Sequence, residues 1–401
     1  MRILYFSFVE LDIPIACRTH TLGVLKGFAN QGCQVDALIP RPTKIFPQIP
    51  GVRFFYLWPW QFSPIGIVWV KLLCGLMMLW LCLKNRYDFI YVRELQLNPG
   101  PRLCSKAFKI PLYIEINDLL VPSLSNAGAH PGFVSLIARH QQMDCRQASG
   151  LIVPSVPMRQ WLVDHYRLEP TKVHLVLNGA DRPAEHPSTK REARGRLGIP
   201  QDCFCVGFVG NLYGRYDFDT LLDSLRACRT KIPPFYLLLI GDGSLKNDLQ
   251  QKIIECGLEK KALFTGYIEH ELLGRYIPAM DVGMCLSDQV SLKLYGPVST
   301  KPATYGIFKI PVIVSGTPLA GYPEALCQSL FWVPAEDSAA LSDLFLGIYK
   351  NSEERKRKGK ALHAFVCSEM TWDAVAGVIT RIARHRNPYP VPAEHDCACH
   401  G

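Results

Sequence analysis

Short apolar runs alternate with amphipathic stretches along the first half of the chain. The stretch 19–32 has the periodicity of a helix and ends at Gly32, a residue type that commonly terminates helices. The apolar runs predict strands at 2–8, 33–39, 52–57, 88–93, 111–116, 150–155 and 172–177. Strands that alternate with helices favour a parallel sheet covered by helices on both faces.

The second half of the chain repeats this pattern. Strands are expected at 203–210, 235–243, 262–268, 281–287, 310–315 and 330–335. The stretch 371–385 predicts a strong final helix. Between the halves, 178–200 is rich in proline and charge and contains no strand, so it predicts an interdomain connection that ends in a short helix.

Two halves with the same pattern predict an α/β protein of two Rossmann-like, doubly wound domains that face each other across a cleft. We expect an N-terminal domain, a connection, a C-terminal domain, a final helix and a disordered tail at 1–177, 178–202, 203–370, 371–386 and 387–401. Doubly wound folds bind ligands at the carboxyl ends of their strands. The cleft is therefore the expected site.

Composition narrows the range of partners. The chain has 401 residues, of which 48% are hydrophobic and 20% charged, as expected for two folded domains. Its net charge of +9 suits nucleic acid, anionic lipid or a phosphorylated substrate. Because the basic residues are scattered and no dense basic tract with interleaved aromatics occurs, we do not expect nucleic acid as a partner.

The fifteen cysteines lie mostly in apolar runs, where a free thiol behaves as a small hydrophobic group. Their number is odd, and the N-terminus reads as a strand rather than a signal peptide. A reducing, cytoplasmic compartment is therefore expected. The tail 395–400 reads HDCACH, which either binds a metal or is an unfolded terminus; we favour the terminus and expect no metal.

The stretch 64–86 is unusually apolar. The twenty residues 64–83 contain one charge, Lys71, so the length suffices to span a bilayer. Crossing the membrane would pull apart the sheet that contains strands 52–57 and 88–93, so a buried or half-buried helix is favoured. Tryptophans and basic residues in 58–86 suit a helix resting in the membrane interface: Trp58, Trp60, Trp69, Trp80, Lys71, Lys84 and Arg86. A plain core helix remains the alternative.

The stretch 207–222 reads as a strand, a glycine turn and a helix. Such junctions often bind phosphate, because a helix N-terminus offers free N–H groups and the positive end of a dipole. This turn carries Arg215 but lacks the G-x-G-x-x-G pattern and the G-K-[ST] ending of common phosphate loops. Its ligand is not identified by the motif alone.

The order of the motifs resembles the retaining GT-B glycosyltransferases of the family 4 type, over nearly the whole chain. The matching phrases lie at 90–93, 111–119, 176–181, 207–213, 237–250, 263–287 and 301–315. The resemblance implies transfer of a sugar, with retention, from a nucleotide-diphosphate donor to a saccharide or lipid-linked acceptor. It implies an acceptor-side first domain, a nucleotide-sugar second domain and no cofactor.

The resemblance also implies site residues, with departures. Asn211 and Tyr216 stand where the family has a basic pair, so Arg215 is expected to hold the donor diphosphate together with N–H groups of the glycine turn. Gly296 and Thr304 stand where the family has two glutamates, while Lys301 matches a lysine of polysaccharide-making members. A surface arginine at a helix start is the alternative for Arg215.

The remaining candidates complete three groups. The catalytic candidates are Glu115, Asn117, Arg215 and Lys301. The donor-binding candidates are Gly210, Asn211, Gly241, Asp242, Gly243, Gly266, Tyr267 and Thr304. The candidates for the acceptor or for phosphate are Glu10, Arg18 and His20. The structural alternatives are ordinary turn glycines for 241–243, a polar loop cap for 115–118 and a helix-start residue for His20.

Two other functions stay open at this point. One is a catalytically inactive GT-B paralogue that serves as a binding or assembly subunit. The other is a sugar-nucleotide epimerase of the same fold, which needs acidic and histidine residues in the cleft.

Overall fold

The computed structural model describes residues 1–13, 16–44, 46–58, 64–93, 97–183, 186–228, 230–232, 234–297 and 299–385, without the side chains of 64–68 and 385. Trp60 and the tail 387–401, including the HDCACH run, lie outside these residues.

Seven strands of the described chain form the first sheet. They are β1 (Arg2–Ser7), β2 (Gln34–Pro40), β3 (Val52–Leu57), β4 (Phe89–Arg93), β5 (Leu112–Glu115), β6 (Gly150–Val153) and β7 (Val173–Leu175). All neighbours pair in parallel, in the order β3-β2-β1-β4-β5-β6-β7.

The second sheet has six strands within the same part of the chain. They are β8 (Phe204–Val209), β9 (Phe235–Ile240), β10 (Ala262–Gly266), β11 (Val282–Cys285), β12 (Val312–Ser315) and β13 (Phe331–Val333). They also run parallel, in the order β10-β9-β8-β11-β12-β13. The prediction of two doubly wound α/β units is confirmed.

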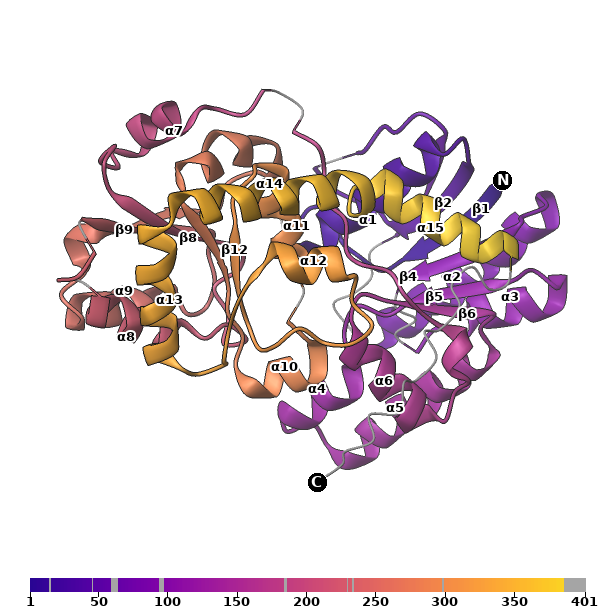
Figure 1. Cartoon of the computed structure of the whole chain (residues 1–401). Helices are drawn as coiled ribbons and strands as arrows, with labels where there is room; N and C mark the ends of the chain where they lie inside the picture. The colour runs from indigo at the N-terminus through magenta and orange to yellow at the C-terminus, as the bar shows by residue number, and fades with distance from the viewer. Residues whose placement is uncertain are drawn as a thin grey trace, which may run out of the picture.

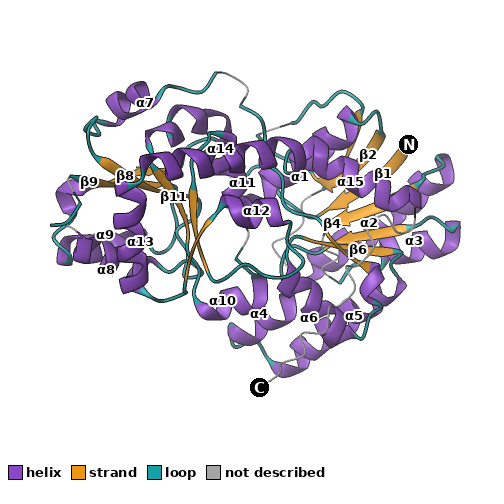
Figure 2. Cartoon of the chain, viewed as in Figure 1, coloured by secondary structure: helices purple, strands orange, loops and turns teal. Residues whose placement is uncertain are grey.

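Helices lie on both faces of the two sheets (Figure 2). Those of the first half and the connection are α1 (Ala16–Asn30), α2 (Pro64–Lys84), α3 (Gly100–Phe108), α4 (Leu120–Asn126), α5 (Pro131–Gln147), α6 (Val156–Tyr166) and α7 (Lys190–Leu197). Those of the second half are α8 (Phe218–Cys228), α9 (Lys246–Glu255), α10 (Gln289–Tyr295), α11 (Thr300–Ile307), α12 (Glu324–Ser329), α13 (Ser338–Lys350), α14 (Ser352–Glu369) and α15 (Trp372–His385). Short 3-10 helices are η1 (Pro170–Lys172), η2 (Glu259–Lys261), η3 (His270–Arg275) and η4 (Ile277–Ala279).

The alternation of side chains along β1 divides the first domain into two cores. Leu4 and Phe6 point to one face and pack in a cluster that includes residues of α2 and α6. Ile3 and Tyr5 point to the other face and pack in a cluster with residues of α1 and α15. Because successive strand residues face opposite sides, a fully apolar strand such as β1 requires a helix layer on each face.

The last helix returns to the first domain. In Figure 1, α15 continues from α14 over the N-terminal sheet and lies along α1. Two glycines of α1 permit this approach: a Cβ at Gly23 would lie 2.3 Å from the ring of Trp372, and one at Gly27 would lie 2.3 Å from the Trp372 carbonyl oxygen. The chain thus crosses between the sheets twice, after β7 and before α15.

Helix α2 has two apolar faces. Val70, Cys74, Met78 and Leu81 are buried in the core of the first domain. The opposite face exposes Trp69, Leu72, Leu73, Leu76, Leu79, Trp80 and Leu83. Across the described chain, we find no helix that combines the length and the apolar character needed to cross a bilayer.

Candidate active site

A cavity of about 650 Å³ lies between the two sheets. The first domain contributes the start of α1 and Asp118, which follows β5. The second domain contributes the carboxyl ends of β8, β9 and β10 and the start of α11, and Trp372 of α15 completes the wall. This is the position that doubly wound folds use for ligands.

Lys301 is the most buried cation of this cleft, with 6% of its surface exposed. Its Nζ lies 3.8 Å from the ring centroid of Tyr216 and 4.9 Å from that of Phe208. It also lies against Gly210, since a Cβ there would be 3.0 Å from Nζ. Within the described residues we find no carboxylate paired with Lys301, so cation–π contacts hold its charge at the end of β8.

Arg215 lies at the other side of the same turn. Its guanidinium stacks 4.1 Å from the ring centroid of Tyr295, and Nη2 lies 3.8 Å from Asp118 Oδ1. The hydroxyls of Tyr295 and Ser123 are 2.8 Å apart. These contacts join the two domains beside the cleft and hold Arg215 at its edge, with 44% of the side chain exposed.

A third cation, Arg18 at the start of α1, enters the cleft from the first domain. Its Nη1 lies 4.0 Å from Oε2 of Glu269, which also accepts a 3.0 Å hydrogen bond from the Tyr267 hydroxyl. The cleft thus gathers four Lys and Arg side chains from two domains, since Lys26 of α1 also lines it. The sequence predicts Arg18 and Tyr267 as site residues but gives no prediction for Glu269.

The backbone of the glycine turn is already engaged. The N–H of Gly210 donates to Ile240 O at 2.9 Å, and the N–H of Leu212 donates to Asp242 O at 3.0 Å. The side chain of Asp217 accepts from Thr220 N and so caps α8. The expectation that N–H groups of this turn bind the diphosphate is therefore wrong for Gly210 and Leu212, because carbonyl groups at the end of β9 and in the turn after it accept from them.

Gly241, in the turn after β9, is required by the close packing of two turns. Gly241 has φ of +137°, and a Cβ there would lie 2.0 Å from Gly210 O. Its N–H donates to Gly266 O at 2.9 Å. Only glycine permits the turns after β8 and β9 to pack this closely. Gly243 is similar, since a Cβ there would meet Leu212 O at 2.4 Å.

The buried residues His20 and Glu115 and the partly buried Asn117 form one network at the floor of the cleft. Glu115 Oε1 lies 2.8 Å from His20 Nε2 and accepts a 2.7 Å hydrogen bond from Asn117 Nδ2. Tyr91 donates its hydroxyl to Oε2 at 2.8 Å. His20 lines the cleft, whereas Glu115 and Asn117 line a small void beneath it. The geometry makes Glu115 a residue that orients His20.

Glu115 should stabilise the fold in a pH-dependent way. Burial raises the pKa of this carboxyl, but the charge and hydrogen bond of His20, the charge of Arg93 and the bond from Asn117 outweigh it and lower the pKa to about 2. A depressed folded pKa means stability that is present above the unfolded value of 4.5 and is lost as pH falls toward 2. The shift corresponds to roughly 3 kcal/mol.

We therefore expect Glu115→Gln to be less stable than the wild type at pH 6 and the difference to shrink as pH falls from 5 to 3. Urea unfolding at a series of pH values measures it. Asp164→Asn, at an exposed site on α6, is the control. A difference that does not change with pH would show that the charge of Glu115 does not stabilise the fold.

The two positions where the resemblance places glutamates differ in their surroundings. Thr304 lines the cleft, and its hydroxyl donates to Thr300 O at 3.2 Å. Gly296 is not among the cleft-lining residues; a Cβ there would lie 2.9 Å from the Tyr322 hydroxyl and 3.0 Å from Pro157 Cδ. The Cα of Gly296 therefore faces Tyr322 and the first-domain residue Pro157 rather than the cleft.

Some of the other candidates line the cleft and some do not. Asn211 lines the cleft. Four candidates are not among its lining residues: Glu10, Asp242, Gly243 and Gly266. Asp242 pairs with Lys246 at 2.8 Å on the exposed surface. Asp242, Gly243 and Gly266 lie at the ends of β9 and β10, and Glu10 lies in the loop after β1.

Several cleft residues escaped the sequence analysis: Lys26, Asp118, Asp181, Glu269, His270 and Trp372. Asp181 Oδ2 lies 3.2 Å from His270 Nε2, which joins the connection to η3. The ring of Trp372 packs edge-on against His20, with centroids 4.8 Å apart. Asp118 and Asp181 stand inside phrases that carried the resemblance, so they were within reach of the sequence.

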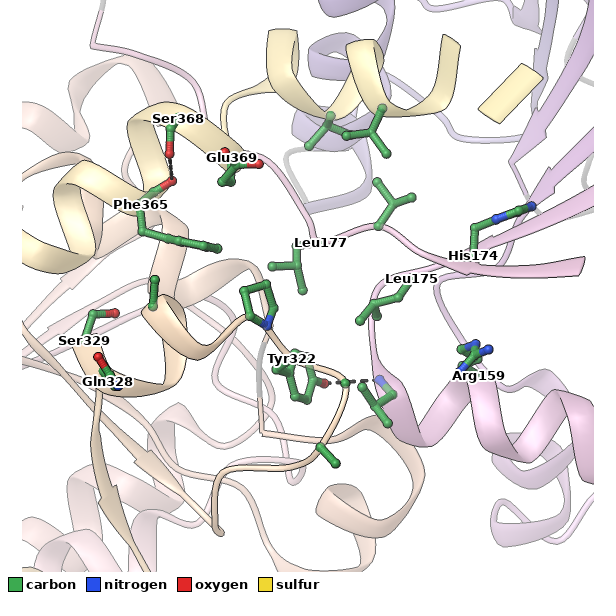
Figure 3. Close-up of a pocket in the computed structure, with 18 of the residues that line it drawn as sticks. Arg159, His174, Leu175, Leu177, Tyr322, Gln328, Ser329, Phe365, Ser368 and Glu369 are labelled. Atoms are coloured by element: carbon green, nitrogen blue, oxygen red, sulfur yellow. Dashed lines mark hydrogen bonds between the residues drawn. The ribbon is translucent and has the colours of Figure 1, made fainter. Parts of the chain in front are cut away.

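A second, larger cavity of about 1020 Å³ lies where the chain passes between the sheets. Figure 3 shows Leu177, Leu175, Tyr322 and Phe365 around it, with Arg159 and His174 at one side. The Tyr322 hydroxyl accepts from Val156 N at 3.3 Å and so links the two domains. Its lining is mostly apolar, unlike the cationic cleft. Among the residues that the structure places, no group of His, Cys, Asp and Glu could hold a metal ion.

Comparison with known proteins identifies the family. The family model "Glycosyl transferases group 1" matches residues 189–363, and the model "Glycosyltransferase Family 4" matches residues 18–182. Together they span most of both domains. The chain belongs to the family 4, group 1 glycosyltransferases.

The chain has distant curated relatives. It is 24% identical over 143 residues to 2-deoxystreptamine glucosyltransferase of Streptomyces kanamyceticus, covering 35% of this chain and 34% of that protein. The chain spans between 24% and 41% of the length of this and two further curated relatives.

Solved structures resemble the chain over most of its length. Anabaena Alr3699/HepE in complex with UDP matches with a TM-score of 0.72 and 16% identity, covering 96% of this chain and 100% of that one; it is also known with UDP-glucose. WaaG, a glycosyltransferase involved in lipopolysaccharide biosynthesis, matches with a TM-score of 0.67 and 11% identity, covering 95% and 100%. At these identities the likeness concerns the fold.

Proposed function

We propose that this chain transfers a sugar, with retention, from a nucleotide-diphosphate donor to a saccharide or lipid-linked acceptor. The observation that carries the proposal is the convergence of Arg18, Arg215 and Lys301 on one cleft between the two domains. A diphosphate that enters such a cleft exchanges water for cationic donors. A uridine nucleotide is the first candidate, because Alr3699/HepE binds UDP and UDP-glucose.

In this mechanism the cations act on the leaving group. Negative charge develops on the diphosphate as the glycosidic bond breaks, and Lys301 and Arg215 stabilise it in place. The leaving phosphate takes the proton of the acceptor hydroxyl on the same face, so the reaction needs no carboxylate base. His20, oriented by Glu115, is positioned to hydrogen-bond a sugar hydroxyl.

Two assays test the proposal. Calorimetry measures the binding of UDP, GDP and ADP, and a coupled assay measures release of nucleoside diphosphate from the matching sugar nucleotides. We expect one nucleotide to bind and its sugar nucleotide to be turned over. Failure of all three nucleotides to bind would contradict the proposal.

Two alternatives have specific support. An inactive binding or assembly subunit is favoured by the absence of both family glutamates, at Gly296 and Thr304. An epimerase is favoured by the pairing of His20 with Glu115 and of His270 with Asp181 around the cleft. Binding without turnover indicates the first alternative, and an epimerised sugar nucleotide indicates the second.

We further propose that the enzyme works at a membrane surface through α2. The exposed apolar residues of α2 recur at spacings of three and four, which places them on one helix face. Lys84 and Arg86 follow this face, as in helices that lie in the membrane interface. The thirteen cysteines of the described chain are free thiols, which fits a reducing compartment and the cytoplasmic face of the cell membrane.

Replacing Trp69 and Trp80 together with serine should release the protein from vesicles of anionic phospholipid. Each ring is about half exposed, 50% and 49%, so the fold should keep its melting temperature. Vesicle sedimentation should show at least tenfold weaker binding, because two interfacial aromatic anchors are lost. Ile254→Ser with Val290→Ser, exposed at 57% and 61% on the second domain, is the control. A variant that unfolds would show that α2 is core, and unchanged binding would place the membrane contact elsewhere.

A further inference from the structure

Positive and negative side chains of the described chain occur in equal number around the cleft. Four lysines or arginines and four carboxylates line it: Arg18, Lys26, Arg215, Lys301, Asp118, Asp181, Glu269 and Glu271. A cleft that receives an anionic donor is expected to carry excess positive charge, because such charge attracts the ligand. In this structure the carboxylates offset the charge that the donor would use.

Two of these carboxylates pair with arginines of the opposite domain. Oδ1 of Asp118, which follows β5 in the first domain, lies 3.8 Å from Nη2 of Arg215 in the second. Oε2 of Glu269, which follows β10 in the second domain, lies 4.0 Å from Nη1 of Arg18 in the first. Both arginines that the proposed function assigns to the donor diphosphate are therefore paired across the cleft.

Each of the two carboxylates is fixed by a hydroxyl group of its own domain. The Ser123 hydroxyl donates to Asp118 Oδ1 at 3.2 Å, and the Tyr267 hydroxyl donates to Glu269 Oε2 at 3.0 Å. These are the same oxygens that face the two arginines. The carboxylates are thus held in place from their own domains, and the arginines reach them from the other side of the cleft.

The two pairs place opposite charges together without fixing the geometry of the arginines. Both distances exceed the roughly 2.7–3.2 Å of an N–H···O hydrogen bond. Arg215 takes its orientation from the Tyr295 ring, whose centroid lies 4.1 Å from the guanidinium. The side chains of Arg215, Asp118 and Glu269 are 44%, 46% and 50% exposed, and ion pairs at such exposure are weak. A diphosphate offers more charge and shorter charge-assisted hydrogen bonds, so it displaces the carboxylates.

From this geometry we infer that Asp118 and Glu269 compete with the donor diphosphate for the two arginines of the cleft. They hold these arginines until the diphosphate takes their place, and their charge lowers the affinity for the donor. Both act through the arginines, so they are positioning residues rather than catalytic ones. The inference rests on the proposed function, since it concerns the same cations.

Removing either carboxylate charge should tighten the binding of a diphosphate. Asp118→Asn and Glu269→Gln keep the shape of the side chain, and each should lower the dissociation constant of UDP about two- to fivefold, as expected for a half-exposed ion pair. The double variant should gain about the product of the two. Calorimetry on the full-length protein measures the constants, with inorganic pyrophosphate as a second probe that carries the charge without the base. Because damage to the fold would weaken binding, a gain reports on the charge.

A second arm of the experiment asks whether Asp118 acts through Arg215. In the Arg215→Ala background, Asp118→Asn should change the dissociation constant of pyrophosphate by less than about twofold, because the side chain for which Asp118 competes is gone. Asp164→Asn in α6 and Glu259→Gln in η2, both exposed and outside the cleft lining, are matched controls and should bind as the wild type. A full gain in the Arg215→Ala background would contradict the pairing, since Asp118 would then act by general repulsion.

Unchanged or weaker binding in both single variants overturns the inference. If one of them fails to fold, the other decides. UDP binding by the wild type without a gain in either variant contradicts only this inference. If UDP, GDP and ADP all fail to bind, the proposed function is contradicted, and the pyrophosphate series still decides the competition for the arginines. If pyrophosphate fails to bind as well, both proposals are contradicted.

Discussion

Replacing Lys301 with alanine is expected to weaken UDP binding by roughly 1–3 kcal/mol, which is about five- to 150-fold. Lys301 is 6% exposed, and its ammonium lies over the ring of Tyr216 beside Gly210. Within the described residues no carboxylate neutralises it, so its charge is available to a diphosphate. A charge-assisted contact in such a buried position is strong because water does not screen it. Calorimetric titration with UDP measures the loss.

Matched variants separate charge from packing. Lys301→Met keeps much of the side-chain volume and should lose as much affinity as alanine. Lys301→Arg should recover part of it. Lys260→Ala, at an exposed site in η2, should bind as the wild type. Equal dissociation constants for the wild type and Lys301→Met would remove Lys301 from the donor site.

Replacing Arg215 with alanine should lower the turnover of the donor by at least tenfold, about 1.4 kcal/mol, and should affect turnover at least as much as binding. Charge builds on the leaving diphosphate in the transition state, so a cation at the edge of the cleft contributes most at that point. The stacking on Tyr295 already orients the guanidinium. Arg215→Lys should be tolerated poorly, because an ammonium cannot reproduce a planar two-point contact.

Steady-state release of UDP from the accepted sugar nucleotide gives kcat and KM for both variants. Arg226→Ala, an exposed arginine in the last turn of α8, the helix that follows the turn with Arg215, is the control. Turnover close to that of the wild type in Arg215→Ala would mean that the turn after β8 is only a fold element. The phosphate contact would then have to come from the first domain, with Arg18 as the next candidate.

The secondary structure and the class of fold followed from the sequence because they depend on local periodicity. Each predicted strand is a short apolar run that must be covered on both faces, and all of them appear in the two parallel sheets. The stretch 64–86 contains the helix α2, since its length and its place between β3 and β4 leave few other arrangements. The position of the cleft followed as well, because parallel sheets bind ligands at the carboxyl ends of their strands.

The sequence also named many of the residues that meet in the cleft. Arg18, Arg215 and Lys301 line it from two domains. Lys301 was indicated by the family resemblance, Arg215 by the glycine turn after a strand, and Arg18 by the loop after the first strand. Their roles in binding the donor remain predictions.

Only the tertiary structure decided how the groups are paired. His20 of α1 is far from Glu115 in the sequence but pairs with it in the fold. Glu115 also accepts a hydrogen bond from Asn117, and both of these residues lie beneath the cleft. The N–H of Gly210 is taken by Ile240, a bond that exists only once β9 lies beside β8.

What the sequence by itself determined is therefore the local and repeated part of this protein: strands, helices, two sheets and a cationic cleft between them. What only the tertiary structure decided is the contact set of each site residue, including the return of Trp372 to His20 and the pairing of Asp181 with His270. The physical reason is that periodicity reports which face of an element is buried. Pairing depends on which distant segments that burial brings together.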